Sequence, residues 1–307
     1  MPGDYQTAEP PGLGHLPTLL ARLLRQAHAD EQTRGALLCD PRVRHIGTSS
    51  DKARLGAGDW AWGCGYRNLQ MLIARWQQII EDAWAAGFDP DGAAHFHRRL
   101  VGKKQWIGTT EVYVALCRLG LRCQIVDFPS PSGPNGQHTK LMQWIENYFR
   151  SASNPADKGP SAITTTTRFP LYFQHDGHSR TIIGIETDAK LQPQLLILDP
   201  AKKVAPPLRK LSEQMSAAES APAQPGRPVD TTTPASAGSV GPTRARKAPE
   251  LDLHAHPKLL GAHRLTLKEL SKKKQYQILY VLDHVPKPAT ADPDQPKFHT
   301  IRSLRIV

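Results

Sequence analysis

A change of apolar period along this 307-residue chain constrains its fold most strongly. In the first half, apolar residues recur at helical spacing, as in the stripe Leu69, Leu72, Ile73, Trp76, Ile79 and Ile80. In the second half, short runs rich in Ile, Leu, Val and Tyr are bounded by Pro, Gly or Asp, as strands are. Helices followed by clustered strands favour an α+β fold over a doubly wound sheet.

The expected elements can be placed by residue range. We expect helices over residues 16–28, from 64 to about 80, over 109–119 and over about 140–150. We expect strands over residues 123–128, 171–174, 180–186, 195–199 and 277–282. The first helix is amphipathic, and two interpretations stay open for it. Its apolar face packs in the core, or it is an arm that contacts a protein partner.

Polar segments divide the chain without splitting it into two domains. Residues 1–12 are expected to form a disordered tail. Residues 151–168 and about 214–248 are too poor in apolar side chains to offset the entropy of ordering, so we expect disorder there as well. The strand 277–282 follows the second of these segments, which is therefore an insertion. We expect one domain over 13–307 with an N-terminal helical arm at about 15–31.

The net charge of +11 is concentrated in residues 201–275, which carry +8 of it. No aromatic residues interleave with these charges, so we interpret them as a solvated loop or a nuclear-import signal and do not expect nucleic acid as a partner. No run of 18 apolar residues predicts a membrane span, and the first residues do not resemble a secretory signal.

Cysteine and histidine spacing argues against disulfides and metal sites. The four cysteines form no CxxC pair, which favours a reducing compartment, the cytoplasm or the nucleus. Two HxH pairs, at 95–97 and 254–256, have no further ligands at suitable spacing. We therefore expect no metal or other cofactor, and we expect a monomer.

Cys64 stands in the stretch WGCGYRN, between two glycines and behind Trp62. It precedes the stripe that begins at Leu69, so we place it in the first helical turn, where unpaired N–H groups stabilise a thiolate. Gly63 and Gly65 leave the sulfur open to an approaching carbonyl. We predict that Cys64 is a nucleophile. The remaining cysteines are interpreted as inert buried residues: Cys39, Cys117 and Cys123.

A cysteine nucleophile needs a histidine, and the histidine needs an orienting group. His178 lies at the mouth of the strand 180–186, and Asp199 closes the strand 195–199. If these strands form an antiparallel hairpin, His178 and Asp199 meet at one sheet edge. The order Cys, His, Asp is that of papain-like proteases. Gln174 ends the preceding strand, where its side-chain amide can serve an oxyanion.

These segments resemble the ubiquitin-fold-modifier-specific protease family, and within it the deubiquitinase branch. The resemblance rests on GDWAWGCGYRNLQML around Cys64, on QWIGTTEVYVALCRLGLRCQIVDF, on PLYFQHDGHSRTIIGIE around His178, and on LLILDP at Asp199. It implies a papain-like cysteine peptidase fold with N-terminal helices packed on an antiparallel sheet.

The resemblance also implies roles for single residues. Cys64 matches the nucleophile, His178 the general base, Asp199 the orienting acid and Gln174 the oxyanion donor. In the other branch of the family, the acid stands two residues before the histidine in an Asp-Pro-His signature. Asp176 mimics this spacing, but the proline is absent, so we favour Asp199.

Trp106 and Glu111, together with Trp62, are expected at the groove for the modifier's C-terminal tail. An acidic residue there would suit the arginines of the tail.

The implied reaction is hydrolysis of the isopeptide bond after the C-terminal Gly-Gly of ubiquitin, with ubiquitin or polyubiquitin chains as partners. Three alternatives remain: a peptidase for another ubiquitin-like modifier such as the ubiquitin-fold modifier, a non-catalytic ubiquitin-binding protein, and a nucleic-acid-binding protein driven by the basic segment.

Overall fold

The computed structural model describes residues 13–46, 64–70, 76–151, 162–220, 251–282 and 301–307. Its helices and helical turns are α1 Leu16–Ala29, α3 Cys64–Gln70, α4 Trp76–Ala85, α5 Pro90–His95, α6 Thr109–Arg118, η1 Pro134–Gly136, α7 Thr139–Arg150, α8 Pro206–Ser220, η3 Leu253–Ala255, α9 His256–Gly261 and α10 Leu267–Leu270. Its strands are β1 Thr33–Leu38, β2 Cys123–Phe128, β3 Ile163–Thr165, β4 Leu171–His175, β5 His178–Asp188, β6 Pro193–Leu198, β7 Arg264–Thr266, β8 Tyr276–Val281 and β9 Ser303–Arg305.

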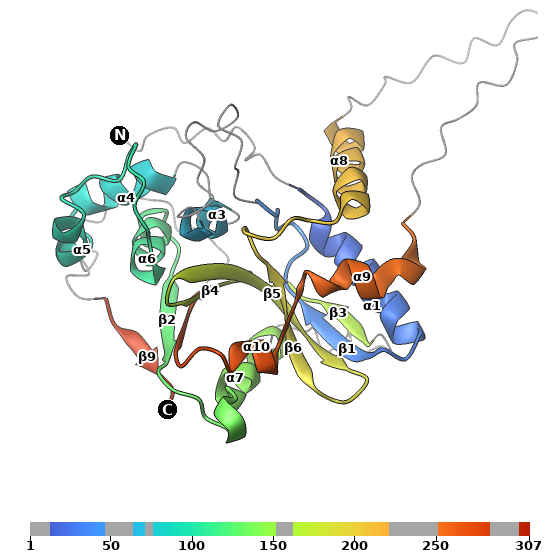
Figure 1. Ribbon diagram of the computed structural model, residues 1–307. Coiled ribbons are helices and arrows are strands. Elements are labelled where there is room, and N and C mark those ends of the chain that lie inside the picture. Colours follow the sequence, from blue (N-terminus) through green and yellow to red (C-terminus); the bar gives the residue numbers. More distant parts are fainter. Residues whose placement is uncertain (1–12, 47–63, 71–75, 152–161, 221–250, 283–300) are drawn as a thin grey trace, which may run out of the picture.

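Within the described residues, the strands form one nine-stranded sheet that crosses the molecule (Figure 1). Along its main path the order is β3-β1-β5-β4-β8-β2-β9, and β6 pairs with both β5 and β7. The pairs at the centre are antiparallel, whereas β1 with β3 and β2 with β9 are parallel. The α+β prediction is confirmed, and the expected antiparallel sheet holds except at these two edges.

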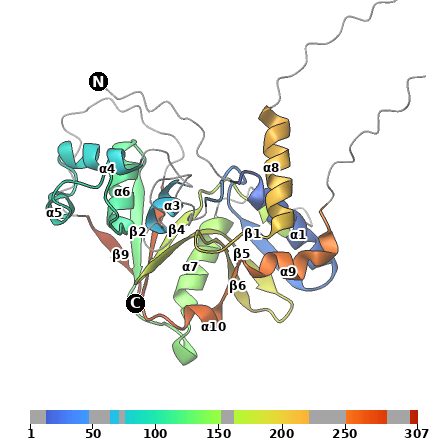
Figure 2. The same cartoon turned by 45° about the horizontal axis from the view of Figure 1, so that its top comes forward.

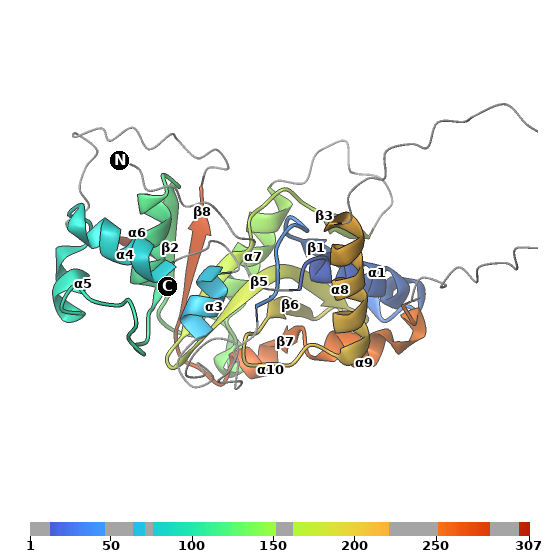
Figure 3. The ribbon, with the colours of Figure 1, turned by 90° about the horizontal axis from the view of Figure 1, so that it is seen from above.

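Two groups of helices cover the sheet at its two ends (Figure 2). Helices α4, α5 and α6 lie beside β2, and α1, α8 and α9 lie at the other end of the sheet. Viewed from above, α3 lies between the two groups and over β5, which it contacts (Figure 3). The short helix that begins at Cys64 is therefore placed over the strand that begins at His178.

The amphipathic face of α1 belongs to the core. Its leucines are almost completely buried against the sheet, and α1 also contacts α8 and α9. The core interpretation of residues 16–28 therefore holds, because the apolar face is already covered by this chain. At the C-terminal end of α1, Asp30 accepts a hydrogen bond from the buried His256 of α9 at 2.8 Å.

All five expected strands are confirmed, with boundaries shifted by a few residues, and so are the helices at 109–119 and 140–150. The predicted helix from 64 to about 80 contains α3 and the start of α4, while residues 71–75 lie outside the described part. At α6 the N-cap residue is Gly108, and the helix itself begins at Thr109, as expected.

Two expectations of disorder are wrong at their edges. Residues 163–165 form β3, because Ile163 is buried and the strand pairs with β1. Residues 214–220 continue α8, whose register buries Leu208, Leu211 and Ser212. The rest of the predicted insertion lies outside the described residues, as does the tail 1–12.

No helix in the described ranges is both long enough and apolar enough to cross a membrane.

Candidate active site

Cys64 is the first residue of α3, and its side chain is buried at the wall of a recess of about 360 Å³. The recess is also lined by Trp106, Ile107 and Gly108 from the loop before α6, and by Gln174 and the residues 176–179 from the β4–β5 turn. The site therefore lies where a helix that carries a thiol meets the end of a hairpin.

His178 and Asp199 are brought together by the β5–β6 hairpin, as the sequence predicted. Thr181 pairs with Leu198, so Asp199, the residue after β6, comes opposite Arg180 and two residues from His178 at the start of β5. His178 Nε2 lies 2.9 Å from Asp199 Oδ1. The other ring nitrogen, Nδ1, is left for the Cys64 thiol, whose interaction with His178 shifts the pKa of both groups.

The Asp199 carboxylate is held at both oxygens. Arg180 Nε donates to Oδ2 at 2.9 Å, and the Ala201 backbone N–H donates to Oδ1 at 3.0 Å. Burial opposes the charged form, but the hydrogen bond and charge of His178, together with Arg180, hold the Asp199 pKa well below its usual range. Asp199 is thus a fixed anion behind the imidazole.

The pKa values of His178 and Cys64 move in opposite directions. Burial alone would lower the His178 pKa, but the hydrogen bonds to Asp199 and Cys64 raise it to about 9. Burial alone would raise the Cys64 pKa, but hydrogen bonds from His178 and from the Ser179 hydroxyl and backbone lower it. These shifts favour a thiolate–imidazolium pair near neutral pH.

A buried polar network lies beneath the thiol. Asn68 Nδ2 donates to the Cys64 carbonyl at 2.8 Å and to Ser179 Oγ at 3.0 Å. Thr181 Oγ1 donates to Asn68 Oδ1 at 2.8 Å. Because Ser179 Oγ accepts from Asn68, its hydroxyl proton is available to Cys64. Asn68, Ser179 and Thr181 are all buried, so the network links α3 to β5 away from water.

Gln174 is oriented by Tyr172 and the loop before α6. The Tyr172 hydroxyl donates to Gln174 Oε1 at 3.2 Å, which leaves Nε2 to donate elsewhere. The amide lies against Gly108, where an added Cβ would come within 3.1 Å of Nε2. Gln174 lines the same recess as Cys64. Its amide thus lies in the wall of the recess that contains the thiol.

The three expected substrate-binding residues differ in placement. Trp106 is half-exposed and lines the recess. Glu111 is buried and does not line it; instead, its carboxylate accepts the Gly108 N–H at 2.7 Å and fixes the loop before α6. The expectation that Glu111 faces the groove is therefore corrected, because helix capping uses its carboxylate. Trp62 lies outside the described residues.

Sequence reasoning missed three residues that touch the site. Asn68 stands four residues after Cys64, one helical turn on, and this spacing was the available signal. Ser179 and Arg180 follow His178 directly; Arg180 was interpreted only as the start of the strand 180–186, and Ser179 stood just before that strand. Asp176, the alternative acid, lies in the β4–β5 turn and lines the recess.

Within the described ranges, no group of three or more His, Cys, Asp or Glu residues is arranged to hold a metal ion.

A cysteine at the start of a helix, facing a histidine and an aspartate from a sheet, is the arrangement of a papain-like cysteine peptidase. The chain belongs to peptidase family C78, whose model matches residues 72–227, about half of the chain. The match includes Gln174, His178 and Asp199, and it begins just after Cys64.

Similar proteins are found among ubiquitin peptidases. Human zinc finger-containing ubiquitin peptidase 1 is 42% identical over 181 residues, which cover 52% of this chain and 31% of the human protein. Ubiquitin carboxyl-terminal hydrolase mug105 of Schizosaccharomyces pombe is 31% identical over 164 residues, which cover 46% of this chain and 61% of that protein. The match thus spans less than a third of the human relative.

A solved structure, the crystal structure of UfSP from C. elegans, has a TM-score of 0.43 and 14% identity, covering 81% of this chain and 34% of that chain.

Proposed function

We propose that this chain is a thiol-dependent deubiquitinase that hydrolyses the isopeptide bond after the C-terminal Gly-Gly of ubiquitin. The observation that carries the proposal is that Cys64 and His178 line one recess while His178 Nε2 lies 2.9 Å from Asp199 Oδ1. Ubiquitin is the favoured modifier because the relatives named above are a ubiquitin peptidase and a ubiquitin carboxyl-terminal hydrolase.

The proposed reaction is acyl transfer through the Cys64 sulfur. The thiolate attacks the carbonyl carbon of the last glycine, and the oxygen becomes an oxyanion bound by Gln174 Nε2 and the Cys64 N–H. His178 Nδ1 gives its proton to the departing lysine amine as the C–N bond breaks, which leaves a thioester. His178 then takes a proton from water, whose oxygen displaces the sulfur.

Asp199 acts on the imidazole in this scheme. The Asp199 carboxylate, which lies beside His178 Nε2, fixes the orientation of the ring and stabilises the imidazolium form that donates the proton. Arg180 in turn fixes Asp199 from the other oxygen. Glycine residues suit the recess beside Trp106 and Gly108, because the backbone of the loop before α6 approaches α3 closely at Gly65, the residue after the nucleophile.

A second candidate is a peptidase for the ubiquitin-fold modifier. The Asp176-Gly177-His178 spacing favours it, because it mimics the signature of that branch.

One labelling experiment separates these functions. The protein would be incubated with ubiquitin and with the ubiquitin-fold modifier, each carrying a thiol-reactive group in place of its last glycine. We expect the ubiquitin reagent to label the protein, Cys64→Ala to abolish labelling, and Cys117→Ala, the matched control, to retain it. Labelling only by the other reagent would favour the second candidate, and no labelling by either would refute both.

A further inference from the structure

A polar row crosses the sheet from the active site to its far edge. The strand register pairs Ser179 with Gln174, Gln174 with Gln277, Gln277 with Asp127, and Asp127 with Arg305. Residues paired across neighbouring strands point to the same face of a sheet. The row therefore lies on one face and leads from beside Cys64 across β5, β4, β8 and β2 to β9.

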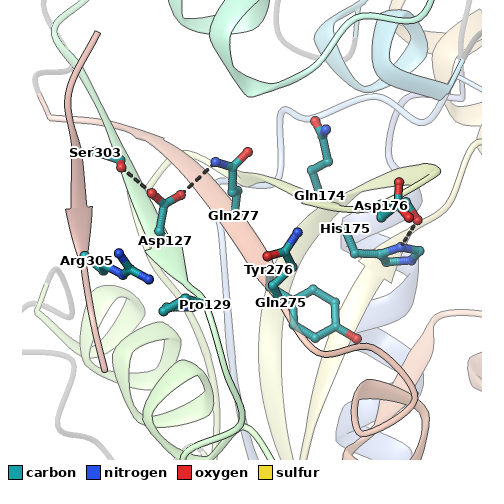
Figure 4. A pocket seen from close by; sticks show the side chains of 10 residues that line it. All are labelled: Asp127, Pro129, Gln174, His175, Asp176, Gln275, Tyr276, Gln277, Ser303 and Arg305. Atoms are coloured by element: carbon teal, nitrogen blue, oxygen red, sulfur yellow. Dashed lines mark hydrogen bonds between the residues drawn. The ribbon is translucent and has the colours of Figure 1, made fainter.

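This row forms part of the wall of a recess of about 620 Å³, which is separate from the one that contains Cys64. Gln277 Nε2 donates to Asp127 Oδ1 at 2.7 Å, and Ser303 also donates to the Asp127 carboxylate. Figure 4 shows Gln277 and Ser303 pointing toward Asp127, with Arg305 on the next strand. Thr109 Oγ1 donates to Gln277 Oε1 at 2.6 Å and holds the glutamine from the opposite side. The side chains of this recess are thus ordered by one another.

The two recesses meet at the active site. Gln174 and Asp176 line both of them. Gln174 is the proposed oxyanion donor, so the junction lies where the reacting carbonyl would sit. A molecule attached at that carbonyl can extend into either recess.

An isopeptide substrate has two polypeptide arms that leave the reacting carbonyl in different directions. One arm is the extended tail of the modifier, and the other is the lysine with the protein that carries it. The recess around Cys64 is bounded by Trp106, Ile107 and the Gly108 backbone, which suits a narrow tail ending in glycine. The larger recess has two carboxylates, Asp127 and Asp176, against one guanidinium, that of Arg305, among amide and hydroxyl groups. It suits a polar segment with basic side chains.

We propose that the recess over the polar row is an acceptor-side site, which binds the polypeptide segment around the modified lysine. This inference rests on the proposed isopeptidase function and adds to it a second binding site. Asp127 is the residue expected to contribute most, because its carboxylate is fixed by Gln277 and Ser303 and needs no reordering when a basic side chain binds.

The test compares two substrates that share one modifier. In the first, the ubiquitin C-terminus carries a small fluorogenic amine, so only the tail arm is present. In the second, it is linked to the lysine of a basic peptide, so both arms are present. The quantity compared is kcat/KM for the peptide-linked substrate divided by kcat/KM for the fluorogenic substrate. For Asp127→Ala we expect this ratio to fall about tenfold. For Arg305→Ala, which removes a positive charge from the outer end of the row, we expect the ratio not to fall. Gln192→Ala, on the β5–β6 turn, is the matched control.

The one-armed substrate also reports whether the Asp127 variant is folded. An equal loss on both substrates would overturn the proposal, because the recess would then hold the tail or support the fold. An unchanged ratio would overturn it as well. If the unaltered protein cleaved neither substrate, the proposed function itself would be refuted. That result differs from a changed ratio of kcat/KM in the Asp127 variant, which concerns only the acceptor-side site.

Discussion

At the scale of single residues, the reactivity of Cys64 depends on Ser179, a neighbour that no sequence motif predicts. The Ser179 hydroxyl oxygen accepts a hydrogen bond from Asn68. The hydroxyl proton of Ser179 is therefore free to stabilise the Cys64 thiolate, and Ser179 lowers the Cys64 pKa. A hydrogen bond to a charged group contributes roughly 1.5–3 kcal/mol. That amount corresponds to about 1–2 pKa units.

We therefore predict that Ser179→Ala raises the pKa of Cys64 by about one unit. The rate of iodoacetamide alkylation at Cys64, followed by mass spectrometry from pH 4 to 10, would show the acid limb moved to higher pH. Ser132→Ala, an exposed serine ahead of α7, should leave the profile in place. An unmoved limb in Ser179→Ala would mean that His178 alone sets the thiol pKa.

The orienting acid gives a second prediction at this scale. Asp199→Asn should lower kcat about 10³-fold, because the amide no longer stabilises the imidazolium. The alkaline limb of activity should move below pH 9, since Asp199, together with Cys64, raises the His178 pKa to about 9 against the effect of burial. For Asp176→Asn, measured in the same assay, the fall in kcat should be at least tenfold smaller than for Asp199→Asn. The opposite order would return the acid role to Asp176.

At the scale of elements, the approach of α3 to the loop before α6 depends on Gly65. A Cβ at this position would lie 2.7 Å from the Ile107 carbonyl oxygen and 3.3 Å from the Tyr172 hydroxyl. A Cβ atom cannot lie 2.7 Å from a backbone oxygen, so either α3 or the loop before α6 would have to move. Cys64 on α3 and Gly108 on the loop both line the recess, so either movement would alter it.

We predict that Gly65→Ala lowers kcat/KM by at least tenfold and destabilises the fold by roughly 1–3 kcal/mol. Gly261→Ala is the matched control, because nothing lies within 4 Å of an added Cβ there. Activity assays and thermal unfolding would measure the two effects. A fully active Gly65→Ala protein would show that the close approach has no role in catalysis.

The sequence predicted elements better than their contacts. Strands such as 123–128 were predictable because short β-branched runs between turn residues have few other structures available. The short strand β3 was missed, since its burial comes from β1 far away in the chain. The predicted hairpin brought His178 and Asp199 together, but the contacts of Ser179 depend on side-chain packing between distant segments, which periodicity does not encode. The contact of Glu111 is a local capping bond to Gly108, so its spacing of three residues was an available signal.

At the scale of the whole molecule, buried neutral histidines make the fold sensitive to acid. Burial lowers the pKa of His263 to about 4 and also lowers that of His45, and both lie beside the β6 end that carries Asp199. An unfolded histidine titrates near 6.5. As the pH falls below 6.5, the unfolded chain binds protons first, so stability is lost between about 6.5 and 4.

We predict that His263→Gln reduces the loss of unfolding free energy between pH 7 and pH 4.5 by about 2 kcal/mol. Urea unfolding at several pH values would measure it. His254→Gln, at an exposed position, should leave the pH dependence as it is. An identical slope in both variants would mean that the carboxylates dominate acid unfolding.

The network beneath Cys64 has a consequence for synthesis. Cys64 and Asn68 leave the ribosome before Ser179, His178 and Asp199, so during translation the thiol has none of the partners that lower its pKa. The nascent chain thus carries an ordinary, slow-reacting cysteine, and a chain cut short before the β5–β6 hairpin would carry one too. Hydrolytic competence would therefore arise only once the β5–β6 hairpin has folded against α3.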